Sequence, residues 1–140
     1  MFKITPIQDP ETQRRYAELS GTKAVAGAFA YAMFDVESES PMGFSQFEIR
    51  EDGGRLFDLR PIGKDDYEAM FILGRQTMNF IDLCGAHTAK ASDEYTDALL
   101  LRAIGFKKSE NGEYFCNMDG MFDGKHCSGE AVDLDKITKA

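Results

Sequence analysis

The chain has 140 residues, with 24 acidic and 16 basic side chains giving a formal charge of −8, and three cysteines. This length fits one domain around a single core, and the charge is spread along the chain without a basic cluster, so nucleic acid is a poor partner. No apolar run approaches the roughly 18 residues of a membrane span, and three irregularly spaced cysteines exclude a complete disulfide framework. We therefore expect a cytoplasmic protein that does not enter a membrane.

The first third of the chain predicts a strand, a helix and a second strand. Phe2–Thr5 is a short strand candidate, and Asp9-Pro10-Glu11 supplies an N-cap, a first-turn proline and an acid for a helix that Gly21 ends. Val25–Val36 alternates large side chains with alanines. This pattern predicts a central strand that is covered on both faces, with the alanines allowing a helix to lie close.

The middle third predicts two more strands and a long helix. Ser45, Phe47 and Ile49 alternate with polar residues, which indicates a half-exposed strand, and Asp52-Gly53-Gly54 turns the chain into a strand over Arg55–Arg60. The three strands should form an antiparallel meander. After a turn at 61–63, a helix from about residue 65 to residue 84 should bury one stripe, consisting of Met70, Leu73, Thr77, Phe80, Ile81 and Cys84, and expose Asp65, Glu68, Arg75, Asn79 and Asp82.

The last third predicts a strand, a helix and a hairpin. His87–Ala91 is a short strand, Ser92-Asp93-Glu94 opens a helix through Ile104, and Gly105 stops it. Asn111-Gly112 then predicts a hairpin between residues 106–110 and 113–118. From Asp119 onward the sequence has turn chemistry and a weakly amphipathic tail that includes Val132, Leu134 and Ile137.

Three short motifs accompany this order of elements. They are Met42-Gly43-Phe44, Leu59-Arg60-Pro61 and Ile104-Gly105-Phe106. With these motifs, the chain resembles the GNAT superfamily of acyl-CoA N-acyltransferases between residues 25 and 118. The resemblance implies a single mixed α/β domain over residues 1–140, with an antiparallel meander, a strand-helix-strand crossover and a C-terminal hairpin.

The resemblance also implies a cofactor, which would be acetyl-CoA or another acyl-CoA, and transfer of its acyl group to an amine of unknown identity. In the family, the turn after the fourth strand holds the CoA diphosphate, and this places Leu59, Arg60 and Lys64 as cofactor-binding residues. Backbone N–H groups at a helix start can approach phosphate closely when glycines leave the turn open.

The chain departs from the family at both the cofactor-binding turn and the general-acid position. Tyr67 and Ala69 stand where the family has glycines, and the first turn of the long helix holds Asp65, Asp66 and Glu68. These acids stabilise the helix dipole themselves and oppose a diphosphate. The position of the family's general-acid tyrosine is Leu101, and Tyr95 lies nearly two turns too early to inherit that role. The catalytic residues are therefore unknown.

Two functions remain open. One is an acyltransferase-like enzyme with altered cofactor and general-acid positions, and the other is a non-catalytic module that binds a ligand or a protein on the same scaffold. The two differ at Lys64–Ala69, because a first turn closed by its own carboxylates would favour the module. An acidic domain rich in strands is also compatible with a homodimer, although the sequence indicates no interface.

A third hypothesis is a thiol or metal enzyme built on Cys84, Cys116 and Cys127. Cys84 and His87 could form a nucleophile and base, but Cys84 continues the buried stripe, so a packed core thiol is favoured. His126 next to Cys127 is an awkward pair of zinc ligands without a C-x-x-C partner, so we expect no metal.

Two further features have a structural and a functional interpretation. Arg60 could meet an anionic ligand at the end of its strand or form a salt bridge with a nearby acid. Bulky side chains gather near the same strand, and they favour core packing over a ligand pocket. They are Phe29, Tyr31, Met33, Phe57, Tyr67, Met70 and Phe71.

Overall fold

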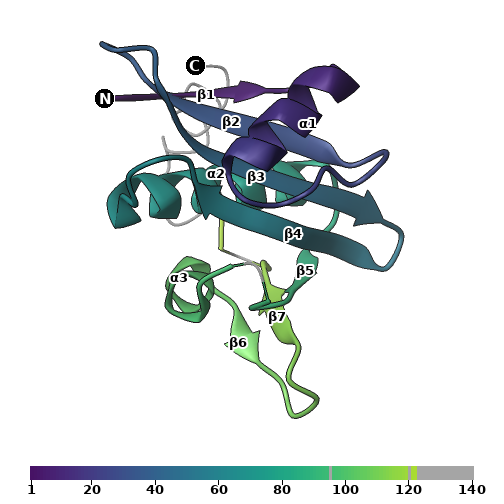
Figure 1. Ribbon diagram of the computed structural model, residues 1–140. Helices are drawn as coiled ribbons and strands as arrows, with labels where there is room; N and C mark the ends of the chain where they lie inside the picture. Colours follow the sequence, from purple (N-terminus) through teal and green to yellow (C-terminus); the bar gives the residue numbers. More distant parts are fainter. Residues whose placement is uncertain (95, 120, 123–140) are drawn as a thin grey trace.

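The computed structural model describes residues 1–94, 96–119 and 121–122. In this part of the chain one sheet has seven strands in the order β1-β2-β3-β4-β5-β7-β6, with three helices packed on it (Figure 1). The predicted mixed α/β architecture is confirmed. The elements in chain order are β1 (Phe2–Pro6), α1 (Pro10–Leu19), β2 (Phe29–Asp35), β3 (Pro41–Arg50), β4 (Gly53–Pro61), α2 (Tyr67–Leu83), β5 (Thr88–Ala91), α3 (Ala98–Ile104), β6 (Lys107–Lys108) and β7 (Tyr114–Asn117).

The connections follow the predicted order. Strands β1 to β4 pair antiparallel with their neighbours in sequence, so the predicted meander is confirmed. Helix α2 then crosses from β4 to β5, which pair parallel, and β6 and β7 form the predicted hairpin, with Gly112 at a φ of 86°. A parallel pair needs such a crossover, because a tight turn can only reverse the chain direction.

The sheet is covered on both faces, as the alternation in β2 predicts. Helix α1 lies in front of the sheet in Figure 1 and α2 lies behind it. Ala30 and Ala32 pack with Ala17 of α1, whereas Tyr31 and Met33 belong to the larger core on the α2 side. The small alanine side chains let α1 approach the strand closely.

Strand β2 is shorter than predicted, because it begins at Phe29 and not at Val25. Residues before it form a turn in which the Ala28 N–H donates to the Val25 carbonyl, and Gly27 has a φ of 80°. Strand β3 is also not half-exposed, since Ser45 and Gln46 are both buried. Helix α2 covers one face there, with the Ser45 hydroxyl 2.9 Å from Thr77 Oγ1, and the segment before β2 covers the other.

Helix α2 keeps most of its predicted buried stripe, with two corrections. Asn79 is buried, although the spacing placed it on the wet face. One turn earlier on the helix, the Arg75 guanidinium lies 4.8 Å from the Phe122 ring, so this side of α2 is covered as well. Cys84 is exposed, so the prediction of a packed core thiol is wrong. The helix has ended there, and Cys84 serves as its C-cap before Gly85 turns the chain at a φ of 97°.

Helix α3 begins later than predicted. It starts at Ala98 with Asp97 as its N-cap, whose carboxylate accepts from the Leu99 N–H at 3.0 Å, so Ser92-Asp93-Glu94 does not open it. The stop at Gly105, with a φ of 120°, is confirmed. The predicted tail residues Val132, Leu134 and Ile137 lie outside the described residues. Within the described part, no helix is long and apolar enough to cross a membrane.

Candidate functional site

A β-bulge in β4 opens the sheet at its centre. Gln46 pairs with Asp58 and Phe47 pairs with Leu56, so Phe57 is one extra residue on β4. The parallel pairing with β5 reaches its last pair at Leu56 and Ala91, while β4 continues to Pro61. The two strands therefore separate just where the bulge lies. Bulges often occur beside functional sites because they redirect a side chain.

The side chain redirected by this bulge is Asp58. Without the extra residue, Asp58 would share the face of Leu56, which belongs to the core on the α2 side. Asp58 pairs instead with Gln46 on the opposite face and is only 3% exposed. Its Oδ2 accepts a hydrogen bond of 2.6 Å from Gln46 Nε2, whereas its Oδ1 has no hydrogen-bond partner in the described part of the chain.

Burial is the main influence on the ionisation of Asp58 and raises the pKa of its carboxyl above the ordinary value. Hydrogen bonds from Gln46 and Thr22 and the charge of Arg60 act in the opposite direction, but they do not cancel the cost of removing the carboxylate from water. A buried carboxylate oxygen without a donor is costly to a folded protein and suited to a cationic ligand.

Gln46 fixes this carboxylate to the segment between α1 and β2. Its Nε2 also donates to the Lys23 carbonyl at 2.8 Å, and its Oε1 accepts from the Val25 N–H at 3.0 Å. The amide thus has partners on both of its polar atoms and holds the segment against the sheet. It also leaves Asp58 Oδ1 as the polar atom that still needs a donor.

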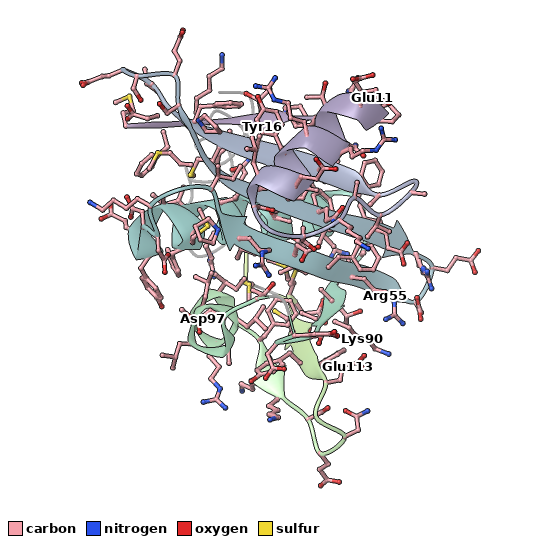
Figure 2. All side chains as sticks on the ribbon, viewed as in Figure 1. Glu11, Tyr16, Arg55, Lys90, Asp97 and Glu113 are labelled. Atoms are coloured by element: carbon pink, nitrogen blue, oxygen red, sulfur yellow. The ribbon has the colours of Figure 1, made fainter. Side chains whose placement is uncertain are left out.

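Asp58 lines a cavity of about 790 Å³ on the α1 side of the separated strands. Lys90 and Glu113, which line this cavity, lie close together in Figure 2, with Lys90 Nζ 3.9 Å from Glu113 Oε1. Arg55 Nε lies 4.0 Å from Glu48 Oε1. Lys90 and Arg55 thus have acidic partners of their own. The lining residues are Glu18, Gly21 to Val25, Arg55 to Asp58, Lys90, Ala91, Ser92, Glu94 and Glu113.

A smaller cavity of about 390 Å³ lies at the end of β4, beside the start of α2 and the segment before α3. Four acidic side chains line it, at Asp65, Asp93, Glu94 and Asp97. The Leu59 N–H, which β4 presents beyond its pairing with β5, donates to Thr96 Oγ1 at 3.2 Å, and Thr96 is buried. The segment before α3 thus provides a hydrogen-bond acceptor for a backbone N–H group in the gap between the separated strands.

The three residues predicted to bind the cofactor have different surroundings and do not form one site. The Leu59 side chain is buried and its N–H is occupied by Thr96, as described above. Arg60 Nε donates to the Ser20 carbonyl at 2.7 Å, at the C-terminal end of α1. Lys64 is exposed and follows Gly63, whose φ is 72°. Leu59 and Arg60 line the smaller cavity, and Lys64 is not part of its lining.

The start of α2 is closed by its own side chain. Asp66 is the N-cap, and its Oδ1 accepts from the Ala69 N–H at 3.1 Å, while Asp65 and Glu68 add negative charge beside it. A diphosphate binds such a helix start through free N–H groups and a positive dipole. Here one N–H is taken and the dipole is already neutralised, so these residues do not fit a CoA diphosphate.

The predicted thiol sites do not assemble within the described residues. His87 Nδ1 lies 2.6 Å from Asp82 Oδ1, which raises the pKa of the imidazole, and not beside the exposed Cys84. Cys116 is buried in the core, and burial raises the pKa of its thiol to about 11. No group of three metal-binding side chains occurs in this part of the chain. His126 and Cys127 lie outside it.

The bulky side chains named from the sequence do not form one pocket. Met33 is fully buried in the core. Phe57 lines the Asp58 cavity, Tyr67 and Met70 line the smaller cavity, and Phe29 and Tyr31 line a third one near the start of β2. The strands and α2 thus distribute them over separate sites.

Comparison with known proteins gives a fold and no close relative. No family model matches the chain, and no curated protein matches its sequence. Among solved structures, the solution structure of a "Putative N-Acetyl Transferase YhhK from E. coli Bound to Coenzyme A" matches with a TM-score of 0.61 and 13% identity, over 84% of this chain and 98% of that chain. The chain therefore has the GNAT fold, which confirms the predicted architecture.

Proposed function

We propose that the chain is a ligand-binding module on a GNAT scaffold and that it binds an amine through Asp58. The observation that carries this proposal is the buried Asp58 Oδ1, which has no donor among the described residues, in a side chain that lines a cavity of about 790 Å³. An ammonium group would donate to Oδ1 and would add its charge to that of Arg60, which already favours the carboxylate form. The neighbouring Lys90 and Arg55 do not supply this donor, because each has an acidic partner.

The chemistry of Asp58 suits both holding an amine and accepting a proton from it. Burial raises the pKa of its carboxyl, so its affinity for a proton is higher than that of an exposed aspartate. A bound ammonium restores the charged form by direct pairing. Asp58 is the residue that we assign to the amine, and Gln46 and Thr22 position it.

The region that would bind an acyl donor is where this chain departs from the GNAT pattern. Since the helix start and the acidic cavity beside it do not fit a diphosphate, we derive no transfer step through CoA. The alternative weighed from the sequence, a ligand-binding module on the GNAT scaffold, is the function that the start of α2 supports best.

Acyl transfer from an acyl-CoA is the second candidate, and one local observation favours it. A side chain at Gly63 would meet no atom within 4 Å, so the turn before α2 is open, and the exposed Lys64 follows it. The structural neighbour also carries coenzyme A. A cofactor that is held mainly from this turn would leave the Asp66 cap in place.

Calorimetric titration at low salt tests both candidates. The ligands are primary amines of increasing size, from propylamine to phenethylamine. We expect at least one of them to bind saturably, and the corresponding alcohols not to bind. Asp58→Asn should abolish this binding, whereas Glu18→Gln, at an exposed acid of the same cavity, should retain it. Equal binding by the Asp58 variant would refute the proposed site.

The same titration with acetyl-CoA and CoA decides the second candidate. We expect no detectable heat and an unchanged melting temperature. Micromolar binding of acetyl-CoA that is lost in Lys64→Glu would instead establish the acyl-CoA enzyme and direct the search to its acceptor amines.

A further inference from the structure

A third cavity, of about 840 Å³, surrounds the start of β2 and is not used by the proposed function. Its walls come from β1, the first turns of α1, the segment before β2, and the second half of α2. Its volume is that of a small-molecule site, and most of its lining is apolar. The lining residues are Ile4, Pro6 to Gln8, Pro10, Gln13, Arg14, Ala24 to Tyr31, Phe47, Gln76 and Phe80.

One wall of this cavity is a cluster of four aromatic rings. Phe47 stacks with both Phe29 and Tyr31, with ring centroids 5.7 Å apart, and Phe80 meets all three rings edge-on at 5.8 to 5.9 Å. Phe29 is nevertheless 49% exposed. An exposed ring within an ordered aromatic cluster presents a flat apolar surface to any ligand that enters.

Two polar groups in the same cavity lack partners. Gln76 is 8% exposed and Tyr31 is 7% exposed, yet neither side chain has a hydrogen-bond partner in the described part of the chain. Gln13, in the same lining, donates to the Ile7 carbonyl at 2.6 Å and to the Ala28 carbonyl at 3.3 Å. Their polar atoms are not among the fully buried atoms without a partner, so the amide and the phenol are open to the cavity that they line and can pair with a ligand there.

The protonation state of Tyr31 fits this role. Burial raises the pKa of its phenol to about 12, with a smaller effect of Cys84, so the hydroxyl stays neutral and remains a donor at physiological pH. The Gln76 amide supplies both a donor and an acceptor. Arg14 belongs to an exposed ion pair with Glu11 at 2.7 Å, so it does not bring a free charge to the aromatic wall.

We propose that this cavity is a second ligand site for a neutral aromatic carboxamide. The ring lies against the aromatic cluster, and the carboxamide pairs with the Gln76 amide and the Tyr31 hydroxyl. A carboxylate is disfavoured because it would be desolvated against four aromatic rings without a paired cation. The amine site does not enter this argument, since Asp58 lines a different cavity.

The test uses the full chain and NMR titration with phenylacetamide and with benzamide. We expect saturable shifts that weaken at least tenfold for phenylacetate and for toluene. Gln76→Leu should reduce affinity for phenylacetamide at least tenfold, because it removes the amide that pairs with the ligand. Tyr31→Phe should weaken binding of phenylacetamide, because it removes the hydroxyl while leaving an aromatic ring in the cluster.

Two controls keep the result specific. Ile72→Ala alters α2 outside the cavity lining and should bind phenylacetamide as the wild type does. Asp58→Asn should also bind it normally, so that failure of the amine site and failure of this site are distinguishable. The inference is overturned if neither amide binds at millimolar concentration, if toluene binds as well as the amides, or if Gln76→Leu binds phenylacetamide with wild-type affinity.

Discussion

Replacing Asp58 by Asn should stabilise the protein at neutral pH. The carboxylate is 3% exposed, and its Oδ1 has no partner in the described part of the chain. An Asn side chain keeps an acceptor for Gln46 Nε2. The substitution removes the buried charge while keeping the shape of the side chain.

The size of the effect follows from the unpaired oxygen. Leaving a buried polar group unpaired costs about 1–3 kcal/mol, so Asp58→Asn should raise the free energy of unfolding by about that amount. For a chain of this length each kcal/mol corresponds to about 3 °C, so the melting temperature should rise by about 3–9 °C.

The pH dependence gives the same prediction a second, independent readout. Because the pKa of Asp58 is raised above its ordinary value of 3.8, the folded state holds this proton more tightly than the unfolded state does. The wild type therefore loses stability from Asp58 as pH rises from below 3.8 through the folded pKa. Asp58→Asn lacks this loss, so the two proteins should be closest in acid and differ most at neutral pH.

Urea unfolding followed by circular dichroism is the suitable assay, since the chain has no tryptophan. Glu18→Gln removes an exposed acid near the same cavity and controls for net charge. If Asp58→Asn were less stable than the wild type at neutral pH, Asp58 would have a stabilising partner, and the assignment of its Oδ1 to a ligand would be wrong.

Three further predictions test contacts elsewhere in the fold. Thr77→Val leaves the buried Ser45 hydroxyl without its partner at 2.9 Å and should cost about 1–3 kcal/mol in urea unfolding, with Ser45→Ala in the same chain recovering part of the loss. The pKa of His87 is raised by its hydrogen bond to Asp82 and by that residue's charge, so its stabilising effect is complete in acid and disappears as pH rises. His87→Gln should flatten the melting temperature between about pH 5 and 8, and an unchanged profile would contradict the pairing. Asp66→Ala removes the N-cap of α2 and should cost about 1 kcal/mol, measured by thermal unfolding; no loss would mean that water replaces the cap fully.

The sequence by itself determined the elements whose causes are local. The N-cap at Asp9, the glycine stop at Gly105 and the hairpin turn at Asn111-Gly112 each act within a few residues, so the order of strands and helices was readable. That order also carried the resemblance to the GNAT fold. The acidic start of α2 was equally visible, because Asp66 caps a helix that it adjoins in sequence.

The tertiary structure decided the site. Asp58 was missed because it lay inside a predicted strand, and nothing in the local pattern indicates that an extra residue at Phe57 turns it away from the core. A polar residue in the middle of an apolar strand was the available signal. Gln46 was read as half-exposed for the same reason, since the segment that covers it is 21 to 23 residues away in sequence. Periodicity reports which residues share a face, but only packing reveals what covers that face and which buried polar atom is left without a partner.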